Sequence, residues 1–449
     1  MFKIFANAWR VEDIRKKLLF ILLLLFIYRI GAILVPLPGM DFLLLDEFRY
    51  GGADGGDAVM TFFMLLMGGE LGTVFAMGIA PYITASIIMQ LLTYAIPKLS
   101  QMQKEDEDGR KKIQQITRYM SVGLAAIQGG GMVFGYTRHG AQWGVNGGAG
   151  VNLFGENSYI FVYIVATVAM MTGTIFIMWL AELLTEKGIG NGASFLIFAN
   201  ILAGLPRGFM TFWNMLTNSP DFFTILTVVV MLLLFALIIA FVVLVHEGER
   251  RIPVQYSRKA ASGGRSAYGN HNSYIPLKVN IAGVLSIIFA MSLVGFPVQF
   301  AQFFPNAQFL QTIAYYLNMM RPGGMHWIGI IIYIVLIFAF THFYTSFAVN
   351  PVEMAENMKK NGGFIPGIRP GKPTSDFIQT TVNRLSWIGS VFYSLIAITP
   401  IAMSFFAPSE MGQIAFGGTS LLIVTGVALE FVKQLESQLL MRHYKGFLE

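Results

Sequence analysis

The sequence contains no cysteine, and charged residues make up only 12% of the chain. The absence of cysteine excludes a disulfide framework, a thiolate metal site and a cysteine nucleophile, and it leaves the redox compartment undecided. The low charge, beside 55% hydrophobic residues and a mean hydropathy of +0.60, excludes a soluble domain of 449 residues. Repeated apolar blocks of about 18 or more residues instead indicate a polytopic α-helical membrane protein.

Motifs for catalysis are also missing. The chain has no phosphate-binding G-x-x-x-x-G-K-[ST] loop and no G-x-S-x-G elbow, and His246-Glu247 lacks the second histidine of a zinc helix. The charged residues that we assign to the membrane interior are Arg29 and Arg384, with Glu430 near the inner face. Snorkelling or interhelical pairing explains these better than an ion pathway does. We therefore expect no enzymatic activity, no catalytic residue, no metal and no cofactor.

Hydropathy predicts ten full membrane spans. The first apolar run, 18–35, is too long for the core of a signal peptide and lacks a small-x-small cleavage pattern, so we expect it to be retained as the first span. The predicted spans are 18–36, 74–96, 119–137, 158–181, 193–213, 222–245, 280–300, 326–348, 380–402 and 413–433.

The distribution of basic residues predicts the orientation. Of the 31 Lys and Arg residues, 25 lie on the side of the N-terminus and 4 on the opposite side. An excess of Lys and Arg marks the cytosolic face, so both termini are predicted to be cytosolic. The net charge of +6 therefore reflects membrane topology first.

Two inner connections, 246–279 and 349–379, are long and combine basic residues with Gly and Pro. In the first, Arg250, Ile252, Val254 and Tyr256 alternate with period two, which predicts a β-hairpin that projects into the cytosol. Positive-inside bias with contact to lipid headgroups could account for the charge alone. The length and the turn pattern favour a docking site for a large cytosolic partner, formed by Arg250, Arg251, Arg258, Lys259, Arg369 and Lys372.

A short apolar segment, 59–67, lies just before the span that carries Gly78–Thr93. Nine helical residues rise roughly 14 Å, about half the hydrocarbon thickness, so the segment cannot cross the membrane. Glycines 68 and 69 join it to the span, which indicates a re-entrant element. The span itself contains Pro81, Thr84 and Ser86, residues that suit close contact between helices more than contact with lipid. Together the two elements suggest a channel.

The sequence resembles the SecY family, whose members are the central subunits of the bacterial Sec protein-conducting channel. The motifs that carry the resemblance occur in family order: Gly78–Ile88, Glu186–Ser194, Pro276–Val284, Asn350-Pro351, Gly367–Gly371 and Gly417–Ile423. The resemblance implies an all-α fold of ten spans, in two pseudo-symmetric halves around a central pore, with a re-entrant plug. The halves would be 1–206 and 222–449, with a hinge loop at 207–221.

The resemblance also implies functional positions. The constriction ring would consist of Ile79, Ile83, Ile197, Ile201, Ile288 and Ile423. The plug, near 59–71, would include Thr61, Phe62, Phe63, Met64, Gly68, Gly69 and Glu70, and it looks shorter than usual in the family. A lateral gate between the second and seventh spans would have Thr84, Ser86, Met291 and Phe296 near its seam.

The favoured function is a passive protein-conducting channel. It would export unfolded polypeptides across the cytoplasmic (inner) membrane and release hydrophobic segments sideways into the phospholipid bilayer. The expected partners are small membrane subunits resembling SecE and SecG, a SecA-like ATPase motor, the ribosome, and signal peptides with their secretory or membrane-protein precursors. A secondary transporter of a small solute is the alternative, although paired ionisable groups and Gly/Pro breaks at the midplane are missing. A structural scaffold for other membrane subunits leaves the plug-like segment unexplained.

Overall fold

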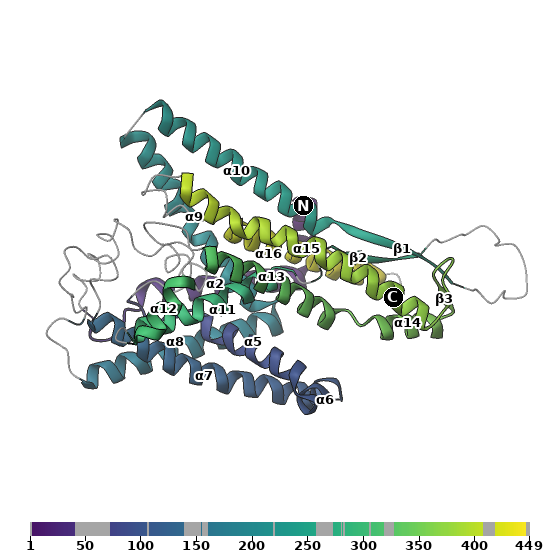
Figure 1. Ribbon diagram of the computed structural model, residues 1–449, viewed down its shortest axis with the longest axis horizontal. Coiled ribbons are helices and arrows are strands. Elements are labelled where there is room, and N and C mark those ends of the chain that lie inside the picture. The colour runs from purple at the N-terminus through teal and green to yellow at the C-terminus, as the bar shows by residue number, and fades with distance from the viewer. Residues whose placement is uncertain are drawn as a thin grey trace, which may run out of the picture.

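The computed structural model describes residues 2–40, 72–105, 107–138, 154, 160–218, 221–256, 273–279, 281, 283–304, 307–317, 327–406 and 418–445. Within them the chain forms an elongated helical bundle with a small β-sheet at one end (Figure 1). The helices are α1 (Phe2–Arg10), α2 (Glu12–Leu34), α5 (Ala80–Ala95), α6 (Pro97–Glu105), α7 (Glu107–Arg138), α8 (Ile160–Lys187), α9 (Gly192–Asn218), α10 (Phe222–Glu247), α11 (Leu285–Phe303), α12 (Gln308–Leu317), α13 (Trp327–Ala348), α14 (Pro351–Lys360), α15 (Lys372–Phe406) and α16 (Gly418–Lys445). The strands are β1 (Glu249–Tyr256), β2 (Ser273–Lys278) and β3 (Gly363–Phe364).

A helix overlaps each of the ten predicted intervals. Within the described residues, four helical stretches are long and apolar enough to cross a membrane by themselves: Glu12–Leu34, Ile160–Lys187, Phe222–Glu247 and Trp327–Lys360. The bent pair Ala80–Ala95 and Pro97–Gln103 meets the same test together. The membrane-spanning helical class is thus confirmed, whereas the number of crossings stays a prediction.

Large apolar side chains are exposed along the outside of the bundle. On α10, Phe222, Phe223 and Leu233 are 73%, 78% and 65% exposed. A helix that is apolar on all sides and still exposed is suited to lipid, because water would penalise that surface. The outer helices therefore present a lipid-facing surface.

Prolines and a glycine set the limits of α5. Gly78, with φ +53°, precedes the helix, and Pro81 lies in its first turn, where the missing N–H has no helical partner to lose. At the other end Pro97 follows directly, and the residue before a proline is disfavoured in the helical region. The chain consequently bends by 107° between α5 and α6.

Small residues bring α7 and α8 close to the turns that precede α5. A Cβ on Gly129 would lie 3.0 Å from Met77 Cε and 3.5 Å from Met170 Cβ, and a Cβ on Gly173 would overlap the carbonyl oxygen of Val74. Gly129 thus lets α7 lie in close contact with Met77 and with Met170 of α8. Glycine is needed at position 173, because a larger residue would collide with the backbone of Val74, whereas a Cβ on Gly129 would require only a small shift of the Met77 side chain.

One large buried cluster connects helices from both ends of the chain. It contains side chains from α1, α2, α5, α8, α9, α10, α11, α13, α15 and α16. A second cluster surrounds Met77, Met132 and Met170 in the first part of the chain. The third lies under the β-sheet, away from the main bundle.

The predicted hairpin is confirmed. Strands β1 and β2 pair antiparallel, with Glu249 opposite Lys278 and Ile252 opposite Ile275. β1 also pairs with the short strand β3 on its other side, which gives the order β2-β1-β3. This third strand was not foreseen.

The connections contain more helix than the sequence indicates. The connection 97–118 holds α6 and the start of α7, and α15 begins at Lys372, eight residues before its predicted span. In the predicted hinge loop, α9 continues to Asn218 and α10 begins at Phe222. The division into halves remains a prediction, with a shorter turn between them.

Candidate functional site

The six predicted ring isoleucines lie on four helices and at one helix start. Ile79 caps α5, Ile83 is in its first turn, Ile197 and Ile201 are on α9, Ile288 is on α11 and Ile423 is on α16. All six are between 1% and 6% exposed, and all belong to the large buried cluster. All six are therefore core residues of one continuous apolar cluster, although they are up to 344 positions apart in the sequence.

Helical spacing explains how pairs of these isoleucines share a face. Ile79 and Ile83 are four residues apart, as are Ile197 and Ile201, and residues at that spacing stack on one side of a helix. Two helices thus present two isoleucines each, and α11 and α16 present one each.

Two buried serines beside the ring residues were not predicted from the sequence. Ser292 follows Ile288 by four residues, and Ser420 precedes Ile423 by three, so each serine shares a helical face with a ring residue. Both are nearly inaccessible, and neither hydroxyl oxygen has a hydrogen-bond partner in the described part of the chain. The helical spacing is the signal that could have identified them.

The predicted gate residues lie on helices that pack against each other. Thr84 and Ser86 are on α5, Met291 and Phe296 are on α11, and all four are half-buried. Ser86 Oγ accepts a hydrogen bond from Gln90 Nε2 at 3.3 Å, and Phe296 stacks on Phe300 with ring centroids 5.6 Å apart. The helices are thus adjacent, while these side-chain contacts stay within each helix.

An aromatic contact that the sequence did not reveal joins α5 to the C-terminal part of the chain. Tyr94 of α5 meets Phe343 of α13 edge-to-face, with ring centroids 5.2 Å apart and an interplanar angle of 79°. Tyr94 is 67% exposed, so this contact lies at the surface.

The predicted plug residues, Thr61, Phe62, Phe63, Met64, Gly68, Gly69 and Glu70, lie outside the described residues. The described residues on either side of the whole gap, 41–71, meet each other. Leu37 donates its N–H to the Gly72 carbonyl at 2.9 Å, and Val74 donates to the Val35 carbonyl at 3.1 Å. The segment between them therefore starts and ends at one place in the bundle.

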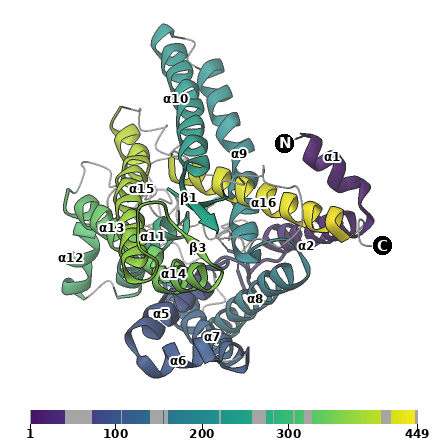
Figure 2. The ribbon, with the colours of Figure 1, turned by 90° about the vertical axis from the view of Figure 1, so that its right-hand side faces the viewer.

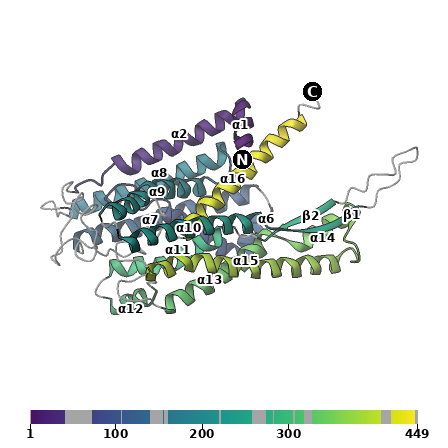
Figure 3. The same cartoon turned by 90° about the horizontal axis from the view of Figure 1, so that it is seen from above.

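The two basic connections, 246–279 and 349–379, form a single module, called here the sheet module and defined as β1, β2, β3, α14 and the first turns of α15 (Figure 3). Ile252, Val254 and Leu277 of the hairpin pack in one buried cluster with Ile365 and Ile378 from the second connection. The sequence did not predict that the two connections pack together, because the apolar residues of each connection alone do not indicate a shared core.

The predicted docking residues of this module are exposed where they are described. Arg250, Arg251, Arg369 and Lys372 all face solvent, and Arg258 and Lys259 lie outside the described residues. Arg251 Nε donates to Glu249 Oε1 at 2.7 Å, and its guanidinium lies 4.9 Å from the centre of the Tyr274 ring. That hydrogen bond raises the pKa of Arg251 above its ordinary value. The carbonyl of Arg369 accepts a hydrogen bond from Thr374 Oγ1 at 2.9 Å, which fixes the loop backbone.

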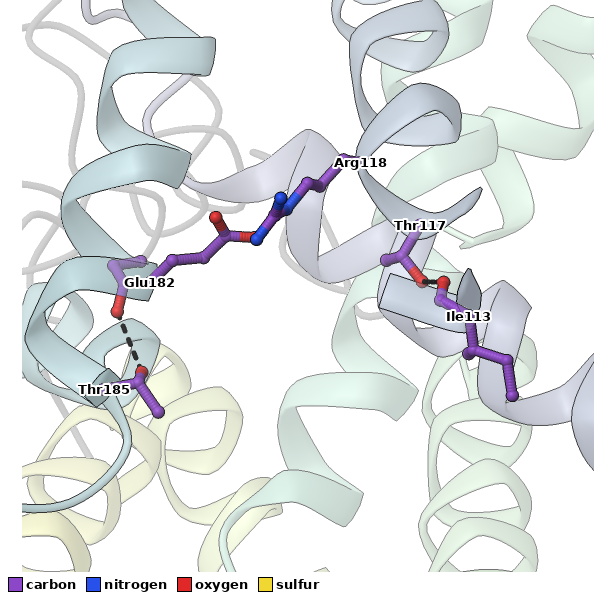
Figure 4. Close-up of polar contacts among 6 residues, drawn as sticks. Ile113, Thr117, Arg118, Glu182 and Thr185 are labelled. Carbon is purple, nitrogen blue, oxygen red and sulfur yellow. Dashed lines mark hydrogen bonds and ion pairs between the residues drawn. The ribbon is translucent and has the colours of Figure 1, made fainter. Parts of the chain in front are cut away.

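A charged pair holds α7 against α8 (Figure 4). Arg118 Nε and Glu182 Oε1 are 2.6 Å apart, and the side chains are 45% and 26% exposed. On either side, Thr117 Oγ1 donates to the Ile113 carbonyl at 2.9 Å and Thr185 Oγ1 to the Ala181 carbonyl at 2.8 Å. The pair was missed, although both residues directly adjoin predicted span ends, at 119 and 181.

Comparisons with known proteins found similarity to one family. A family profile described as SecY matches residues 73–432. The protein translocase subunit SecY of Streptomyces galbus is 42% identical over 451 residues, which cover 100% of both chains.

The chain belongs to the SecY family.

Solved structures share its fold. One described as the structure of a protein conducting channel has a TM-score of 0.60 and 18% identity, and covers 88% of this chain and 90% of that one. Sec61 in a canine ribosome-channel complex from the endoplasmic reticulum has a TM-score of 0.60 and 17% identity, and covers 93% and 90%. The predicted polytopic helical membrane fold is confirmed, and so is the function of a SecY-family protein translocation channel. The solute-transporter alternative is not favoured.

Proposed function

We propose that the six isoleucines form the constriction of this SecY-family channel. The observation that carries the proposal is their convergence, from α5, α9, α11 and α16, in one cluster with exposures of 6% or less. A narrow apolar girdle excludes water and ions by dewetting, and it has no directional bonds to break when a polypeptide passes. β-Branched side chains are stiff, so such a girdle keeps its shape.

Sideways release into lipid would occur where α5 adjoins α11. Thr84, Ser86, Met291 and Phe296 would be close to this seam. A hydrophobic segment would favour the open state by partitioning into lipid. Each Leu or Ile contributes roughly 0.5 kcal/mol at mid-membrane, so about ten suffice to shift a gate that costs a few kcal/mol.

The segment near 59–71 would act as the plug. The hydrogen bonds that join Leu37 to Gly72 and Val74 to Val35 support this role, because they hold together the two ends of 38–71, the stretch that contains the segment, beside the residues that precede Ile79. A segment attached at both ends can leave a pore and return to it.

The sheet module would lie in the cytosol and receive the partner that supplies energy, a SecA-like ATPase or a translating ribosome. The exposed side chains of Arg250, Arg369 and Lys372 support a partner with acidic groups or phosphates. The canine Sec61 relative is described in a ribosome-channel complex. Small membrane subunits resembling SecE and SecG would complete the channel.

The chain would lie in the cytoplasmic membrane with both termini in the cytosol. The ratio of 25 to 4 in Lys and Arg residues supports this orientation. Residues 1–206 and 222–449 would form the two halves of the channel. We propose no catalytic chemistry for the channel itself.

A photo-crosslinking experiment tests the constriction. A photoreactive amino acid replaces Ile83, Ile423 or, as a control, the lipid-facing Leu233 of α10, which is 65% exposed. A secretory precursor arrested halfway through export should crosslink to positions 83 and 423 and not to 233. Capture at 233 alone would place the polypeptide path outside the isoleucine cluster.

A further inference from the structure

Helix α12 joins the ends of α11 and α13 that lie farthest from the β-sheet (Figure 3). Figure 2 shows it at the edge of the bundle, next to α13 and farther out than α11. None of its ten residues is buried, and its sequence contains no Asp, Glu, Lys or Arg. The helix therefore offers an uncharged surface to whatever surrounds the bundle at this end.

Gln311 attaches α12 to the end of α11. Its Nε2 donates hydrogen bonds to the Ala301 carbonyl at 2.6 Å and to the Phe304 carbonyl at 3.4 Å. The last carbonyls of a helix have no partner within that helix, so a side chain from another element can bind them and hold the two elements together. The N-terminal part of α12 is therefore bound to α11.

Gly329 brings the other end of α12 against α13. A Cβ on Gly329 would lie 2.9 Å from the carbonyl oxygens of Tyr316 and Leu317, so the two backbones touch there. Farther along α13, Tyr333 Oη donates to Met291 Sδ of α11 at 4.0 Å. Helices α11, α12 and α13 are therefore fixed to one another.

Large aromatic side chains are exposed at this junction. Phe309 and Trp327 are 76% and 68% exposed. Three more are 44% to 49% exposed: Phe304, Tyr315 and Tyr316. Trp and Tyr are enriched where the hydrocarbon of a membrane meets its headgroups, because their rings are apolar and their N–H and O–H groups are polar. These side chains therefore suit the boundary of a bilayer better than water or hydrocarbon alone.

The lengths of α11 and α13 place α12 near that boundary. The 19 residues of α11 rise roughly 28 Å and the 22 of α13 roughly 33 Å, close to the hydrocarbon thickness of about 30 Å. On α13, Ile328, Ile331 and Val335 are 50%, 57% and 59% exposed and lie on one side of the helix. This lipid-facing side begins beside Trp327, where α13 meets α12.

We propose that α12 is an interfacial helix, whose aromatic side chains lie at the headgroup boundary of the leaflet farther from the sheet module. Its partner is the lipid surface, and because α12 carries no charge, neutral phospholipids suffice. Since Gln311 and Gly329 fix α12 to its neighbours, this boundary sets the depth of the ends of α11 and α13. The inference goes beyond the proposed function and does not depend on it, because it requires only that the chain spans a membrane.

Spin-label depth measurements test the position of α12, and the sequence has no native cysteine that would interfere. Full-length Phe309→Cys and Tyr316→Cys are each labelled with a nitroxide and reconstituted into bilayer discs of phosphatidylcholine alone. The controls are Leu233→Cys in the lipid-facing surface of α10 and Lys360→Cys at an exposed position on α14. Collisions of the label with oxygen, which concentrates in hydrocarbon, are compared with collisions with a water-soluble nickel chelate.

At positions 309 and 316 the ratio of oxygen to nickel collisions should fall between the ratios at 233 and at 360. A ratio equal to that at 360 would overturn the proposal, because α12 would then stand in water, where it could only meet a protein partner. A ratio equal to that at 233 would overturn it too, since α12 would then lie inside the hydrocarbon. If either variant does not fold, Thr312→Cys on the same exposed face replaces it.

A second variant tests whether α12 is held to α11. Gln311→Leu keeps the approximate size of the side chain and removes the donor to the Ala301 and Phe304 carbonyls. Thr312→Val is the matched control, because the hydrogen bond that it loses, to the Gln308 carbonyl, lies within α12. The label at position 309 should become more mobile with Gln311→Leu and not with Thr312→Val. Equal mobility in the two variants would overturn the role of α12 in setting depth.

Discussion

Tyr256 of the hairpin lies over Gly363 of β3, so that a Cβ on Gly363 would come within 2.8 Å of Tyr256 Cε1. The same two residues are paired in the sheet, and Gln255 pairs with Phe364. This small area of contact joins the hairpin to the second inner connection. A partner that binds either connection therefore acts on both.

Replacing Gly363 by valine should separate the two connections. The added side chain overlaps the tyrosine ring, and overpacking of this kind costs about 1–3 kcal/mol. We expect faster amide hydrogen exchange in 249–256 and weaker motor-driven export. Gly123→Val on α7 is the matched control, because a Cβ there would have nothing within 4 Å. If amide hydrogen exchange in 249–256 is the same in Gly363→Val as in the unchanged chain, β3 does not stabilise the hairpin.

Reversing the charge of Arg369 should impair docking without unfolding the chain. The side chain is exposed, while its backbone is held by Thr374 and lies between Gly367 and Gly371, both with positive φ. Arg369→Glu should repel an acidic partner face and reduce export of a secreted reporter at normal membrane levels of the variant. Lys187→Glu makes the same charge change at another exposed site on α8. Equal export by the two variants would remove Arg369 from the docking surface.

The pair Arg118–Glu182 should contribute modestly to stability. Its side chains are partly exposed, so solvent screening limits the interaction, and we expect Glu182→Gln to lower stability by about 1 kcal/mol. The exchange of charges, Arg118→Glu with Glu182→Arg, should recover part of the loss if the pair itself matters. Thermal unfolding in detergent measures both. If the exchanged variant loses more stability than the losses of the two single variants add up to, interactions with other neighbours dominate.

Features with a local periodic signal could be predicted from the sequence. The alternation of Arg250, Ile252, Val254 and Tyr256 predicted β1. Hydropathy predicted ten spans, and the structure has a helix in each of those intervals. Strand β3 has only two residues, Gly363 and Phe364, so no alternation could reveal it. It exists because β1 offers a free edge, which is a contact between distant parts of the chain.

The candidate site was predictable to a smaller extent. The isoleucines were assigned by family resemblance, because an isoleucine in a membrane helix gives no sign of whether it faces lipid or core. The contact of Arg118 with Glu182 depends on how α7 and α8 are rotated relative to each other. Hydropathy constrains that rotation weakly in a membrane, where both lipid and core are apolar.

The ring itself gives the most direct test of mechanism, because it should seal by dryness and shape. Ile83→Leu and Ile423→Val keep an apolar constriction and should leak little. Ile83→Asn and Ile423→Asn should wet it and let small ions pass through the resting channel. The double Asn variant should leak more than either single one, since water needs a continuous path. Deleting 59–71 should increase the leak further.

Single-channel conductance of purified protein in planar bilayers, without any partner, measures this leak. Ile177→Asn on α8 is the matched control: Ile177 is 0% exposed in the same buried cluster, yet it is not a ring residue. An asparagine buried there carries a similar desolvation cost, roughly 2 kcal/mol or more, and so reports what destabilisation alone does to conductance. Leak from the ring variants and none from Ile177→Asn would therefore assign the effect to the constriction. If the ring variants conduct no more than Ile177→Asn, even with 59–71 deleted, the six isoleucines are ordinary core residues and the polypeptide passes elsewhere.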